Sequence, residues 1–97
     1  SRLYDVLSLK NNGSNFQYWK HRVLTVLNLR GLMGLINGTE SKPDPSNPLV
    51  LENWVIRDKE AQAQITLTLK DKPLSGVLYV NTAQEAWKKL KEQYEGK

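Results

Sequence analysis

The chain has 97 residues, with 14 lysine and arginine residues against 10 aspartate and glutamate residues, and a formal net charge of +4. It contains no cysteine and one histidine, which excludes disulfide bonds, thiolate metal sites, a cysteine nucleophile and a zinc site built on paired histidines. The length predicts a single small domain, residues 1–97, whose core suffices for folding but leaves little surplus stability.

The N-terminal part of the chain predicts a short apolar segment, a turn and a long helix. Leu3 to Leu9 is compatible with either helix or strand, Asn11-Asn12-Gly13 is a turn signal, and Ser14 with Gln17 matches a capping box. A helix of about four turns follows, and Gly31 suits its C-terminal cap. Its apolar stripe consists of Phe16, Trp19, Val23, Val26 and Leu27. A β-hairpin around Asn12-Gly13 is the alternative, but the stripe is too long for a strand.

The middle of the chain predicts a short helical turn, a loop and a second long helix. Leu32 to Ile36 forms a helical turn at most, and residues 37–48 predict an exposed loop. The second helix is expected to begin near Asn47 or Pro48 and to end before Pro73. Its buried face is expected to carry Trp54, Asp58, Ala61, Ile65, Thr68 and Leu69.

The C-terminal part predicts a third long helix. Pro73 to Val80 fits a short helix or an extended connector, and Thr82 with Glu85 forms the clearest capping box of the chain. The helix that follows is expected to end at Gly96 and to bury Ala83, Ala86, Trp87, Leu90 and Tyr94. We therefore predict an all-α fold, a small bundle of three longer amphipathic helices plus one or two short helices. Each long helix carries one tryptophan, and we expect Trp19, Trp54 and Trp87 in the core.

Motifs for catalysis or phosphate binding are weak. His21 lies between Lys20 and Arg22, and the chain has no Gly-x-Ser-x-Gly motif that would supply a serine nucleophile for it to activate. The carboxylates are spread over helix faces and form no pair suited to acid–base catalysis. We therefore predict no enzyme activity, cofactor or metal site. The Gly31-Leu-Met-Gly34 spacing matches a backbone-clamping loop but lacks polar residues to meet phosphates. The sequons at Asn12 and Asn37 are interpreted as turn residues.

Three blocks of the chain, in order, resemble copia-type retrotransposon Gag. They begin at Leu9, Trp54 and Thr82 and together cover residues 9–95. The matching positions, which we expect to carry the fold, are Leu9, Gly13, Asn15, Phe16, Trp19, Trp54, Asp58, Ala61, Ile65, Leu69, Thr82, Glu85, Trp87, Leu90 and Tyr94, with Ala83 and Ala86 inside the third block. Asp58 is the one carboxylate on an apolar face, and we expect it to accept hydrogen bonds from a tryptophan N–H or a neighbouring helix.

The resemblance implies a retroelement capsid N-terminal domain, a cytoplasmic structural protein that self-associates into a virus-like particle packaging element RNA. It implies as partners other copies of the chain and a downstream capsid domain of the same polyprotein, of which this chain is expected to be a fragment. RNA contacts are expected mainly through regions outside the chain, and no membrane partner is expected. The alternatives are an RNA-binding module and a host-domesticated Gag-derived adaptor. The positions expected to be exposed for assembly or RNA are Lys20, Arg22, Arg30, Lys88 and Lys91.

Overall fold

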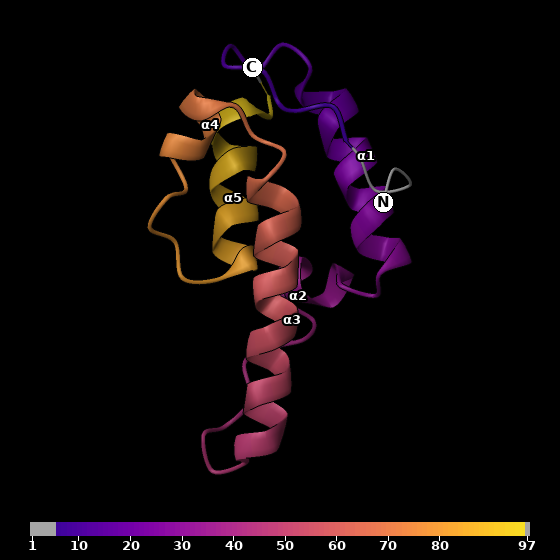
Figure 1. Ribbon diagram of the computed structural model, residues 1–97. Coiled ribbons are helices and arrows are strands. Elements are labelled where there is room, and N and C mark those ends of the chain that lie inside the picture. Colours follow the sequence, from indigo (N-terminus) through magenta and orange to yellow (C-terminus); the bar gives the residue numbers. More distant parts are fainter. Residues whose placement is uncertain (1–5, 97) are drawn as a thin grey trace.

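The computed structural model describes residues 6–96, which form five helices (Figure 1). They are α1 (Phe16–Leu29), α2 (Met33–Asn37), α3 (Pro48–Thr66), α4 (Asp71–Ser75) and α5 (Ala83–Tyr94). The all-α prediction, with three longer and two short helices, is confirmed. Within residues 6–96 the only strand-like pairing is an isolated parallel bridge between Leu9 and Leu69, so the hairpin alternative is wrong. The expected segment Leu3 to Leu9 lies partly outside the described residues, at positions 3–5.

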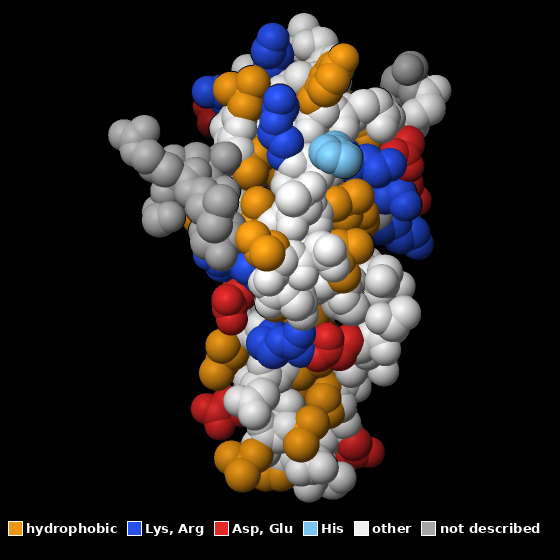
Figure 2. Space-filling model, turned by 90° about the vertical axis from the view of Figure 1, so that its right-hand side faces the viewer, with side chains coloured by type: hydrophobic (Ala, Val, Ile, Leu, Met, Phe, Trp, Pro, Cys, Tyr) orange, Lys and Arg blue, Asp and Glu red, His pale blue; other side chains and the backbone are white. Residues whose placement is uncertain are grey.

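Helix α3 is the longest element and gives the molecule its elongated shape, with extents of 43 × 27 × 21 Å. Its C-terminal half lies among α1, α2 and α5, whereas its N-terminal half extends past them and has only the loop 38–47 beside it (Figure 1). Hydrophobic side chains are exposed at this protruding end (Figure 2).

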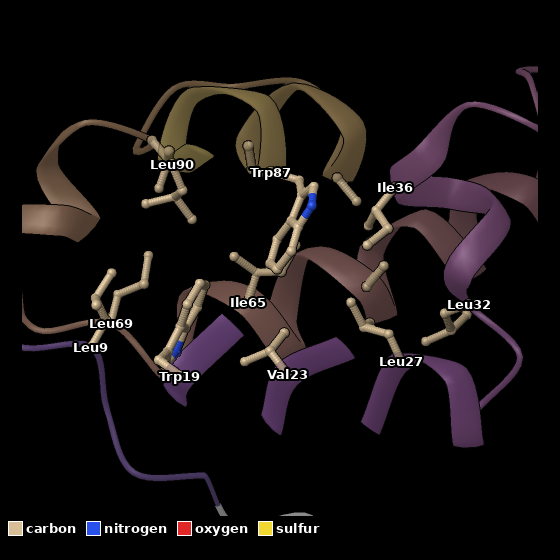
Figure 3. Packing of buried hydrophobic residues seen from close by; sticks show 14 of the residues in the cluster. Leu9, Trp19, Val23, Leu27, Leu32, Ile36, Ile65, Leu69, Trp87 and Leu90 are labelled. Carbon is tan, nitrogen blue, oxygen red and sulfur yellow. The ribbon is translucent and has the colours of Figure 1, made fainter. Parts of the chain in front are cut away.

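The core lies where α1, α3 and α5 meet, and two tryptophans dominate it (Figure 3). Trp19 on α1 and Trp87 on α5 are 0% and 6% exposed, and their ring centroids are 5.7 Å apart. Ile65 on α3 lies beside both rings (Figure 3). Since each ring buries a large apolar area, these contacts account for much of the packing in so small a domain.

Trp54 differs from the expectation that all three tryptophans are core residues. It is only half-buried and packs against the edge of the core, because it lies on the part of α3 that begins to protrude. Its indole Nε1–H donates to the carbonyl oxygen of Glu40, at 2.9 Å. Arg57, one turn further on, donates to the Glu40 carboxylate and to the Gly31 carbonyl. Trp54 and Arg57 therefore fasten the loop after α2 onto α3.

The first helix does not start as predicted. Helix α1 begins at Phe16, its N-cap is Asn15, and no side chain caps it, so the capping box of Ser14 and Gln17 is wrong. The Asn15 side chain is engaged elsewhere: its amide donates to Ser8 O at 3.0 Å and its oxygen accepts from Lys10 N at 2.9 Å. The other end matches the prediction, because Gly31 has φ +71° and closes a Schellman cap with Leu32 N–H bonded to Leu27 O.

Asp58 joins α3 to the start of α5. The residue is 3% exposed, and its two carboxylate oxygens accept from the backbone N–H of Ala83 at 3.0 Å and from the Gln62 amide at 2.8 Å. Thr82 Oγ1 accepts from Glu85 N, as the capping box predicts, but the Glu85 carboxylate accepts from Asn81 N. The Thr82 cap and the Asp58 carboxylate therefore satisfy two of the free N–H groups of the first turn of α5.

Replacing Asp58 by alanine should destabilise the domain by about 2–3 kcal/mol, because it leaves the buried Ala83 N–H without an acceptor. Chemical unfolding followed by tryptophan fluorescence measures this change in the free energy of unfolding. The exposed loop variant Lys42→Ala is the control, with an expected change of about 0.5 kcal/mol or less. Equal effects of the two substitutions would contradict the assigned role of Asp58.

Candidate functional site

A groove between α1, α2 and α5 brings together three of the five predicted basic surface residues. The groove has a volume of about 610 Å³. Lys20 on α1 and Lys88 and Lys91 on α5 stand around it. The rest of its lining consists of Leu24, Met33, Ile36, Asn37, Gln84, Trp87 and Glu92. We call this feature the lysine groove.

The floor of the lysine groove is apolar. Ile36 and Trp87 are buried core residues, and Leu24 and Met33 are half-buried beside them. The lysine groove therefore joins an apolar floor to a cationic rim. The apolar floor suits apolar groups, and the cationic rim suits acidic side chains or phosphates.

Acidic groups moderate the charge of the rim. Lys20 forms an ion pair with Glu95, just after α5, and Glu92 lies in the groove itself. The hydrogen bond from Lys20 holds the pKa of the Glu95 carboxyl below its ordinary value, and the nearby Lys91 charge acts in the same direction. Two of the three rim lysines, Lys88 and Lys91, are exposed on α5.

The other two predicted basic residues lie elsewhere. Arg22 is exposed on α1 and does not line the lysine groove. Arg30 lies at the C-terminal cap of α1, with its guanidinium 3.8 Å from the carboxylate of Glu60 on α3. The five positions therefore do not form one patch.

The residues of the three resembling blocks lie in the interior and at helix junctions. All of them except Glu85 are buried or half-buried. Trp19 Nε1–H donates to Thr68 Oγ1 at 3.0 Å, and Leu9 pairs with Leu69, so the first block contacts the end of the second. Gly13 has φ +70°, and a side chain there would collide with the ring of Tyr94 from the third block. Burial of that ring raises the pKa of Tyr94.

Comparison with known families decides the class of the protein. A family model for the gag-polypeptide of LTR copia-type matches residues 23–97. The chain belongs to this copia-type Gag family. The match includes the blocks that begin at Trp54 and Thr82, whereas the block from Leu9 to Trp19 precedes it. No curated protein and no solved structure matches the chain.

Membership of the Gag family indicates a structural rather than a catalytic kind of protein. Among the described residues, no three histidine, aspartate or glutamate side chains gather in a way that could hold a metal ion. Within residues 6–96, no helix of the Gag chain has the length and apolar character needed to cross a bilayer.

The sequence predicts that the three rim lysines are exposed, which holds for Lys88 and Lys91 but not for Lys20, because its ion pair with Glu95 leaves it half-buried; the groove itself could not be predicted. Lys20 is about 70 positions from Lys88 and Lys91, and only the packing of α5 beside α1 and α2 brings them together. Met33 and Gln84 were not predicted as site residues. No local pattern marks such residues, because their shared environment depends on tertiary packing.

Replacing Lys20 by methionine should raise the pKa of Glu95 back toward its ordinary value, because the carboxylate loses its hydrogen-bond donor. A carboxyl group whose pKa is lower in the folded state than in the unfolded state stabilises the fold at every pH above the unfolded pKa of about 4.3. This stabilisation is lost as the pH falls through the folded-state pKa. The stability difference between wild type and Lys20→Met should therefore be present at neutral pH and vanish in acid.

Carbon-detected NMR titration of the Glu95 carboxyl tests this shift directly. Lys89→Met removes an exposed lysine of α5 that does not line the lysine groove, and should leave the Glu95 pKa unchanged. If both variants move the Glu95 pKa equally, general charge rather than the Lys20 contact controls it.

Proposed function

We propose that this chain is an N-terminal capsid-type domain of a Gag polyprotein and that its copies self-associate into a virus-like particle that packages RNA. The observation that carries the proposal is the copia-type Gag match over residues 23–97. The all-helical fold agrees with such a role. The chain's partners would be further copies of itself and a downstream capsid domain of the same polyprotein.

The surface supports association between copies. Several large hydrophobic side chains are exposed to solvent, among them Leu67 at 81% and Tyr79 at 91%. Exposed apolar surface is a common feature of sites that bind other proteins. Each contact in a shell can be weak, because a closed assembly repeats it many times and linked domains raise the effective concentration.

The average mass in solution should rise with concentration from the micromolar to the near-millimolar range. Light scattering coupled to size-exclusion chromatography measures it, and electron microscopy of the most concentrated samples shows whether the species are particles. A strictly monomeric chain throughout would contradict self-association by this domain.

RNA binding by the domain itself is a second candidate function, favoured by the convergence of Lys20, Lys88 and Lys91 on the lysine groove. Binding through these residues depends on the release of counterions from the RNA backbone and must therefore weaken steeply with salt. The Lys20–Glu95 ion pair and Glu92 limit the strength of this attraction.

The double variant Lys88→Gln, Lys91→Gln should bind single-stranded RNA more weakly than wild type. It should also reduce the slope of log affinity against log salt by up to about 1.4, which is about 0.7 for each phosphate that the variant no longer neutralises. Fluorescence anisotropy with a labelled oligonucleotide provides both quantities. Lys42→Gln, in the exposed loop 38–47, is the control. Undetectable binding of wild type at low salt would remove RNA binding from the functions of this domain.

A further inference from the structure

Helix α3 carries a second apolar stripe on the side away from the core. Its core-facing side presents Asp58, Ala61 and Ile65, which are buried. Leu49, Ile56 and Ala63 are each seven residues apart, and all three are exposed. Because seven residues bring a helix back to within about 20° of the same direction, these three side chains share one face. We call it the outer face of α3.

The residues of the outer face are exposed, although at its C-terminal end Ala63 and Leu67 line a hollow together with Val6 and Arg30. Leu49 is 74% exposed and Ile56 is 53% exposed, and Leu67, just after the helix end, continues the line. The N-terminal half of α3 stands clear of the other helices (Figure 1), and hydrophobic side chains are visible at that end of the molecule (Figure 2). A coiled-coil seam has two apolar positions in each heptad, whereas the outer face has one, so it forms a narrower apolar strip bordered by charged and polar residues.

We propose that two copies of this chain pair through the outer face of α3, with the two helices antiparallel and a two-fold axis near Ile56. This inference rests on the proposed self-association and specifies the surface that performs it. In this arrangement Ile56 meets Ile56 of the second copy, and Leu49 meets Ala63. The small side chain of Ala63 leaves room for Leu49, and Leu67 lies next to that contact.

The charges beside the stripe fit an antiparallel pair. Glu52 and Lys59 are seven residues apart and therefore lie along the same edge of the outer face. A two-fold axis between antiparallel helices brings the same edge of both helices together. Glu52 of one copy is then level with Lys59 of the other to within one residue, about 1.5 Å along the axis. The symmetry repeats this opposite-charge pair, so the interface contains it twice.

The other edge of the outer face brings no like charges together in this arrangement. It carries Asn53 and Glu60, also seven residues apart and both exposed. The same two-fold axis places Asn53 of one copy near Glu60 of the other, and an amide can donate to a carboxylate. Glu60 also lies 3.8 Å from Arg30 of its own chain, which offsets its charge. No like charges face one another across the pair.

Because the chain has no cysteine, single introduced cysteines test the geometry without background. Under mild oxidation, Ile56→Cys should form a disulfide-linked dimer, because two copies of residue 56 meet at the axis. Leu49→Cys alone should not, because its two copies lie about 21 Å apart along the axis. A mixture of Leu49→Cys and Ala63→Cys should give the mixed dimer. Leu29→Cys, at a 62% exposed leucine on α1, is the matched control.

Two cross-linking results would overturn the proposal. If Leu49→Cys links to itself as fast as Ile56→Cys, the helices are not antiparallel. If Ile56→Cys links no faster than Leu29→Cys, the outer face of α3 is not the contact. Circular dichroism of each reduced variant checks that these exposed substitutions preserve the fold.

A charge exchange provides a second, independent measurement. Glu52→Lys and Lys59→Glu should each weaken dimerisation several-fold in sedimentation equilibrium, because each places like charges together twice. The double variant should return to within about twofold of the wild-type dissociation constant, because it restores opposite charges. A double variant weaker than both single variants would contradict the reciprocal pairing.

These outcomes separate this inference from the proposed function. If the mass of wild type rises with concentration and the mass of Ile56→Lys rises equally, pairing through α3 is overturned, and self-association takes place through another surface. A rising mass that Ile56→Lys reduces, with an apparent dissociation constant at least about tenfold larger, supports both. A wild-type chain that stays monomeric overturns both.

Discussion

The buried carboxylate of Asp58 sets the position of α5, and much of the remaining structure depends on that helix. Asp58 is only 3% exposed, and its burial is tolerated because one carboxylate oxygen accepts from the N–H of Ala83 at the first residue of α5, where the helix dipole is positive. Four residues after Ala83, Trp87 contacts Trp19 across the core, and one turn further on, Lys91 stands at the lysine groove. The Asp58 contact therefore anchors the start of the helix that carries both Trp87 and Lys91, and the apolar packing of Trp87 and Leu90 holds the rest of that helix in place.

The parts of the fold that could be predicted from sequence are those with local causes. The apolar stripe of α1, the Schellman cap at Gly31 and the Thr82 cap each depend on residues within one or two turns. The Ser14 capping box is wrong because Asn15, the residue that occupies the cap, directs its side chain to Ser8 and Lys10 instead. That choice depends on where residues 8–10 run, which no local pattern specifies.

The two surfaces were harder to predict for different reasons. The lysine groove requires α1, α2 and α5 to pack together, so its residues are distant in the sequence. The outer face of α3 is visible in the sequence as the spacing of Leu49, Ile56 and Ala63, but the stronger core-facing stripe on the same helix conceals it. The two surfaces share no residue, so pairing through α3 would leave the lysines of the groove available for another contact.

The parallel bridge between Leu9 and Leu69 has a consequence for the order of folding. Leu9 N–H donates to Thr68 O and Lys70 N–H donates to Leu9 O, at 2.8 and 3.0 Å, so the bridge closes a loop that contains α1, α2 and α3. Closing such a loop costs chain entropy, and the contact between Trp19 and Trp87 closes one that is longer still. Individual helices form from local contacts, so the segment around Leu9, which is fully buried in the core, is expected to dock together with the packing of α1 against α5 rather than before it.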